Sequence, residues 1–157
     1  MPAPARGAPV RQWPAAALLL ATAAGLSLTA EFGGRSNLAQ PPAATLAVLI
    51  ATLLWLRGAA VHRRPAALVV TALTFGVAVW TLSPALSVAL HLARGEEFDF
   101  FEQFDSKAAR AGALVTAHAV FLGAPTGVFA ALGAAAAALI GARRSPRRDG
   151  CAPRTPG

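Results

Sequence analysis

Four stretches free of Asp, Glu, Lys and Arg divide the chain into apolar blocks separated by short charged segments: residues 12–30, 36–56, 65–93 and 111–142. The apolar residues run on without the alternation that strands of a membrane barrel would show, so we expect helices. A helix crosses the ~30 Å hydrocarbon layer of a bilayer with about 20 residues. The blocks hold 19, 21, 29 and 32 residues, although the strongly apolar part of the second is short.

The pattern therefore predicts an all-α integral membrane protein, built as a four-helix transmembrane bundle. An N-terminal segment (1–12) precedes the transmembrane domain (13–142), and a tail (143–157) follows it. We expect the tail to be disordered, because it is polar, basic and rich in Pro. The expected spans are residues 13–31, 41–57, 66–92 and 111–142.

Two prolines lie inside predicted spans. Pro84 and Pro125 should each kink their helix, because Pro lacks an N–H and its ring clashes with the preceding turn. At ~1.5 Å per residue the fourth span would reach ~48 Å, so it must tilt, bend at Pro125 or begin at the membrane surface.

Composition agrees with a membrane protein. The chain is 55% apolar and 13% charged, against about 25% charged residues in a soluble domain. All but one of its 14 cationic residues are Arg, and Ala, Gly and Pro are abundant, which is typical of a bacterium with a GC-rich genome. A single Cys, Cys151, excludes a disulfide framework.

The distribution of basic residues predicts the orientation. Ten lie in the N-terminal segment, the second connection and the tail, and four in the other two connections. Short cytoplasmic loops are rich in Lys and Arg, so both termini should lie in the cytoplasm of a multi-pass protein of the bacterial inner membrane. An alternative reading takes the first span, which ends in Leu28-Thr29-Ala30, as a cleaved signal peptide.

The connection between the third and fourth spans is acidic and aromatic. Its acids are Glu96, Glu97, Asp99, Glu102 and Asp105, interleaved with Phe98, Phe100, Phe101 and Phe104. We expect a short amphipathic helix in the membrane interface, and as the alternative a surface that docks an extracytoplasmic partner or collects cations. The basic tail should bind anionic lipids, and the chain has too little basic surface for nucleic acid.

Two faces of the last two spans are candidates for packing and chemistry. Gly123, Gly127 and Ala131 form a small face suited to close helix packing. Ser83, Ser87 and His91 form a polar stripe on the third span, which either bonds to neighbouring helices or lines a polar cavity.

The histidines are the weak candidates for a metal or haem site. His91 and His118 are expected at similar depth, where they could ligate a metal. At 100° per residue, however, His118 falls with Leu122, Pro125 and Phe129 on a bulky face that can simply contact lipid. No cofactor is therefore predicted.

No span carries a charged residue at its middle, which argues against a proton-coupled transporter and an ion pump. The chain has no Walker, Rossmann or HExxH pattern, so an enzyme is disfavoured. The favoured hypothesis is a structural or accessory subunit that acts through helix packing and the acidic loop, with a membrane partner, an extracytoplasmic partner or a second copy. The alternatives are a transporter or permeation subunit for a small neutral solute along the polar stripe, and a haem- or metal-binding redox protein.

Overall fold

The computed structural model describes residues 12–32, 39–56, 65–96 and 103–144, which are almost entirely helical and contain no strand. The helices are α1 (Trp13–Phe32), α2 (Gln40–Leu56), α3 (Pro65–Arg94), α4 (Lys107–His118) and α5 (Ala124–Arg144). A π-helical turn, η2 (Ala119–Gly123), joins α4 to α5 without a break. The all-α prediction is confirmed for these residues.

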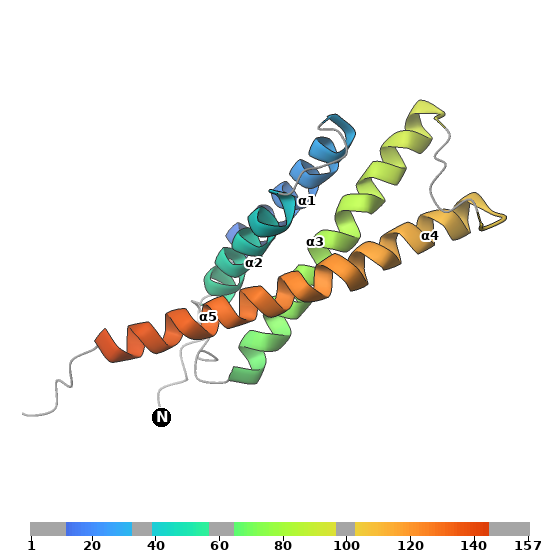
Figure 1. Ribbon diagram of the computed structural model, residues 1–157. Helices are drawn as coiled ribbons and strands as arrows, with labels where there is room; N and C mark the ends of the chain where they lie inside the picture. The colour runs from blue at the N-terminus through green and yellow to red at the C-terminus, as the bar shows by residue number, and fades with distance from the viewer. Residues whose placement is uncertain (1–11, 33–38, 57–64, 97–102, 145–157) are drawn as a thin grey trace, which may run out of the picture.

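The helices run alternately up and down (Figure 1). α1 and α2 lie side by side and both contact α3, while the long rod of α4, η2 and α5 crosses α3 and continues over α2. The ends of α1 and α3 and the starts of α2 and α4 lie at the same end of the molecule. We call this the loop end, because it carries the first and third connections.

Small side chains fill the interior and large ones cover the outside. Most of the buried apolar residues are Ala, among them Ala23, Ala44 and Ala130, each with no exposed surface. The largest exposed side chains include Phe121 and Phe129, exposed by 75% and 63%. This distribution is typical of helices in lipid, where backbones approach through small residues and bulky apolar groups meet acyl chains.

Within the described ranges, three helices are apolar and long enough to cross a membrane: Trp13–Ala30, Ala66–Arg94 and Lys107–Ile140. The second expected span, 41–57, corresponds to α2, which has 17 residues and is therefore ~26 Å long, short of the ~30 Å hydrocarbon layer. Length and composition thus define three candidate spans, consistent with a membrane protein.

Local capping sets the end of α3 and the start of α4, both at the loop end. Gly95, with φ of 71°, ends α3: its N–H bonds to the carbonyl of Leu92, and the N–H of Glu96 bonds to that of His91. This double bond pattern is a Schellman motif, which requires a left-handed residue that Gly adopts without strain. Ser106 begins α4 by accepting a hydrogen bond from the N–H of Ala109.

That cap corrects the predicted start of the fourth span. We expected it at residue 111, after the last charge, but the helix begins at Lys107. A solvated first turn can carry Lys107 and Arg110, and the Arg110 Nε donates to the Phe104 carbonyl at 2.8 Å. The charge pattern therefore marked the edge of the apolar run and not the edge of the helix.

The two internal prolines have different consequences. Pro84 lies inside α3, which continues through it from Pro65 to Arg94. Pro125 follows the π-helical turn, in which the Ala124 N–H bonds to the carbonyl of Ala119. An α-helical Pro125 would press its ring on the carbonyl of Phe121, and the wider turn just before it relieves that clash.

Several sequence predictions concern residues outside the described ranges. The acids Glu97, Asp99 and Glu102 of the acidic loop are among them, as are most of the expected interfacial amphipathic helix, the tail 145–157 and Cys151. Of the connection before α4, residues 103–106 form a turn, and Phe104 and Asp105 are exposed there.

Candidate functional site

The backbones of α3 and the last helix meet at three glycines. A Cβ atom on Gly76 would lie 2.6 Å from the Gly123 carbonyl oxygen and 2.6 Å from the Gly127 nitrogen. A Cβ on Gly127 would in turn lie 2.6 Å from the Cα of Leu73. No larger residue fits at these distances, so α3 of the same chain covers Gly123 and Gly127 of the expected small face. Its third member, Ala131, is also buried.

A buried hydrogen bond lies beside this crossing. The Trp80 Nε1–H donates to the Thr126 Oγ1 at 2.9 Å, and both residues are only 3% exposed. A buried indole N–H needs a partner, so this bond fixes the position of the ring between the helices. Sequence reasoning did not pair these residues, because they are 46 positions apart and neither belongs to a motif.

Trp80 also forms one wall of a cavity near the loop end. The cavity has a volume of about 160 Å³ and lies between α1, α3 and α4, with the start of α2 at its edge. Its polar lining residues are Ser27, Gln40, Trp80, Ser83, Ser87 and His118, and its apolar ones are Leu26, Ala30, Pro84 and Leu114. None of these residues is acidic or basic apart from the imidazole of His118.

The hydroxyl of Ser27 stands out in this lining. Six threonines bond their hydroxyl to the carbonyl four residues earlier in their own helix, at 2.7 to 2.9 Å: Thr22, Thr29, Thr45, Thr52, Thr74 and Thr81. Such bonds satisfy a hydroxyl inside lipid. The Ser27 Oγ is fully buried in a residue 2% exposed and has no hydrogen-bond partner. Ser27 lines the cavity as a residue, but its oxygen has almost no accessible surface there.

His118 lies at this cavity and not on the lipid-facing side. Its ring lies 6.3 Å from that of Trp80, centroid to centroid, at an interplanar angle of 31°. The expectation that it shares a face with Pro125 and Phe129, both exposed, is wrong. In a π-helical turn, residues five apart align as residues four apart do in an α-helix. The turn Ala119–Gly123 therefore rotates His118 toward α3.

The predicted polar stripe divides between two places. Ser83 and Ser87 line the cavity, and Ser83 is 6% exposed. His91 lies one turn further on, at the end of α3, where its Nε2 is 3.8 Å from a Glu96 carboxylate oxygen. Glu96 also lies 4.0 Å from Arg94. The stripe therefore joins the cavity lining to an exposed cluster of charges.

The two candidate metal ligands, His91 and His118, have different neighbours. The Nδ1 of His91 bonds to the carbonyl of Ser87 at 3.0 Å, and that of His118 bonds to the carbonyl of Leu114 at 2.8 Å. The Nε2 of His91 faces Glu96. Within the described ranges no three His, Cys, Asp or Glu side chains are grouped as metal ligands would be.

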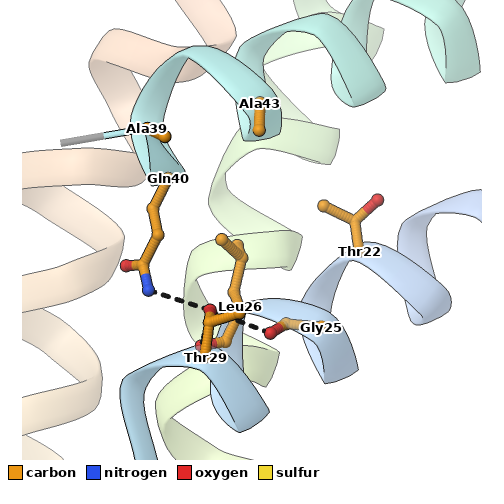
Figure 2. A pocket seen from close by; sticks show the side chains of 7 residues that line it. All are labelled: Thr22, Gly25, Leu26, Thr29, Ala39, Gln40 and Ala43. Atoms are coloured by element: carbon orange, nitrogen blue, oxygen red, sulfur yellow. Dashed lines mark hydrogen bonds between the residues drawn. The ribbon is translucent and has the colours of Figure 1, made fainter. Parts of the chain in front are cut away.

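An open depression lies beside the cavity, between α1 and α2 (Figure 2). It has a volume of about 330 Å³ and is lined by small or apolar groups, with Thr22, Thr29 and Gln40 as its polar members. The amide Nε2 of Gln40 donates to the Thr29 Oγ1 at 2.9 Å, as Figure 2 shows. Gln40 and Leu26 line both spaces, so these two side chains form the wall between them.

The sequence placed Ser83 and Ser87 together because they share one helix face, but it gave no sign of Ser27 or Gln40. Both come from other helices, and a lone Ser in an apolar helix is a common packing residue. Only the packing of α1, α2 and α4 against α3 brings them to one cavity.

No protein-family model matches this chain, and neither the curated proteins nor the solved structures contain a significantly similar one.

Proposed function

We propose that the chain is a multi-pass protein of the bacterial inner membrane that binds a small uncharged molecule in the cavity near its loop end. The placement of ten of its 14 cationic residues on one side supports an orientation with both termini in the cytoplasm. In this orientation α2 crosses the membrane in addition to the three longer helices, and the cavity lies toward the outer leaflet.

The observation that carries the binding function is a partly open cavity of about 160 Å³ between the helices, whose lining combines Ser83, Ser87 and His118 with apolar groups. Pockets that bind small molecules have such a mostly apolar lining with a few polar groups. The described lining residues offer hydroxyl, amide and imidazole groups but no carboxylate, ammonium or guanidinium, which favours an uncharged guest. This is the solute class that the polar stripe suggested for transport, here assigned to a binding site.

The function is tested with three uncharged single-ring probes: benzene, anisole and phenol. The full-length protein is reconstituted in lipid nanodiscs and titrated by ligand-observed NMR, with empty nanodiscs as the reference for partitioning into lipid. We expect saturable binding of at least one probe. An Ala30→Trp variant should abolish it, because Ala30 lines the cavity from an exposed position where a larger side chain has room.

The matched control is Ala21→Trp, on the same helix at an exposed position outside the cavity lining. It should bind the probes as the wild type does. Binding that survives Ala30→Trp, or no saturable binding of any probe, would overturn the proposed function.

The accessory role expected from the sequence remains a prediction. Its glycine face contacts α3 within the chain, and three acids of its docking loop lie outside the described residues, so neither feature adds to it. Recovery of one stoichiometric partner protein with the tagged chain from its native membrane would favour this role. The haem or metal alternative is tested by the absorption spectrum and metal content of the purified protein.

A further inference from the structure

The cavity lining also indicates the chemical class of the guest, provided that the proposed binding function holds. The tautomer of His118 decides which hydrogen-bonding group this side chain offers. The Nδ1 of this ring lies 2.8 Å from the carbonyl oxygen of Leu114. A carbonyl oxygen only accepts hydrogen bonds, so Nδ1 carries the proton of the neutral ring. The other nitrogen, Nε2, is then an acceptor.

Among the described lining residues no other side chain ionises, and the ring of His118 lies 6.3 Å from that of Trp80 in a half-buried position. With its proton at Nδ1, the ring offers Nε2 as the acceptor of the site.

The volume and lining of the cavity suit an aromatic guest. A volume of about 160 Å³ is close to that of an engineered protein cavity of ~150 Å³ that admits one benzene ring. The ring of Trp80 and the apolar groups of Leu26, Pro84 and Leu114 provide the apolar walls. A single ring therefore fits inside this partly open space.

We infer that the cavity binds a neutral, single-ring molecule carrying an O–H donor, of the phenol or hydroquinone type, whose hydroxyl donates to the Nε2 of His118. An ether or a ketone, which only accepts, leaves the imidazole acceptor unpaired and binds less well.

The test compares phenol with anisole, in which a methyl group replaces the hydroxyl proton while the ring stays. Both are titrated into the full-length protein in nanodiscs by ligand-observed NMR. We expect phenol to bind about tenfold more tightly than anisole, the effect of one hydrogen bond in a buried site. In a His118→Phe variant, which keeps an aromatic ring and removes the acceptor, phenol affinity should fall to that of anisole, and anisole affinity should not change.

Ser27→Ala serves as a matched control in the cavity lining, because the Ser27 Oγ makes no hydrogen bond and has almost no accessible surface. It should leave the affinities for phenol and for anisole unchanged. The elution volume and helical circular dichroism of each variant establish that it is folded.

The possible results distinguish a failure of this inference from a failure of the proposed binding function. If phenol and anisole bind equally and both are lost in Ala30→Trp, the cavity is a binding site but the donor requirement is wrong. If phenol is preferred and His118→Phe leaves the preference intact, the assignment of the acceptor to His118 is overturned. If no probe binds saturably, the proposed function itself fails.

Discussion

Trp80 links the helix crossing to the cavity, because its indole N–H bonds to Thr126 on one side and its ring lies against His118 on the other. The position of one wall of the cavity thus depends on a single buried hydrogen bond between α3 and α5. Replacing Thr126 removes the acceptor and leaves the indole N–H buried without a partner.

We therefore expect Thr126→Val to lower the free energy of unfolding by about 1–3 kcal/mol. The matched control is Thr81→Val, because the Thr81 hydroxyl bonds only to the Val77 carbonyl of its own helix and is exposed; its effect should stay within about 0.5 kcal/mol. Unfolding in mixed micelles, followed by circular dichroism, gives both values. In a Trp80→Phe background the cost of Thr126→Val should shrink, and equal costs in the two backgrounds would contradict a direct bond.

At the scale of elements, the three-glycine crossing of α3 and the last helix decides how close the two can lie. A Cβ on Gly127 would approach the Leu73 Cα to 2.6 Å and the Ala72 carbonyl to 3.0 Å, and both are backbone atoms that cannot rotate away. Gly127→Ala should therefore destabilise by about 1–3 kcal/mol through overpacking, despite the better helix propensity of Ala.

Gly25→Ala is the control for this substitution, since nothing lies within 4 Å of its added Cβ. It should leave stability unchanged or raise it by up to about 1 kcal/mol. Thermal unfolding of the two variants in one detergent provides the comparison, and equal midpoints would contradict the close crossing. Because the glycines contact α3 of the same chain, sedimentation should show that Gly127→Ala does not alter the oligomeric state.

The π-helical turn explains which parts of the fold and site the sequence could predict. The existence and approximate bounds of the helices follow from apolar run length, and the shared face of Ser83 and Ser87 follows from α-helical spacing within a regular helix. The same spacing failed for His118, because the turn before Pro125 inserts one residue and rotates everything before it by roughly 100°. A wheel drawn at constant spacing has no means of finding such a turn.

At the scale of the whole molecule, small residues inside and bulky apolar residues outside provide the physical case for a bilayer. The number of crossings depends on α2, because its 17 residues span only ~26 Å. Local thinning of the bilayer or a shift of flanking polar groups can accommodate such a mismatch at modest cost. If α2 crosses, the connections before and after it lie on opposite sides of the membrane.

Cysteine labelling measures this directly, because the chain has a single native Cys, Cys151. In a Cys151→Ser background we would place one cysteine before α2, as Asn37→Cys, and one after it, as Ala60→Cys. In spheroplasts of a bacterial host, a membrane-impermeant maleimide should label the Asn37→Cys protein at once and the Ala60→Cys protein only after permeabilisation. The native Cys151 should behave like the latter, since the basic tail is expected in the cytoplasm. If the Asn37 and Ala60 variants are labelled from the same side, α2 does not cross the membrane. If the labelling of all three cysteines is reversed, the proposed orientation is inverted and the cavity lies toward the cytoplasm.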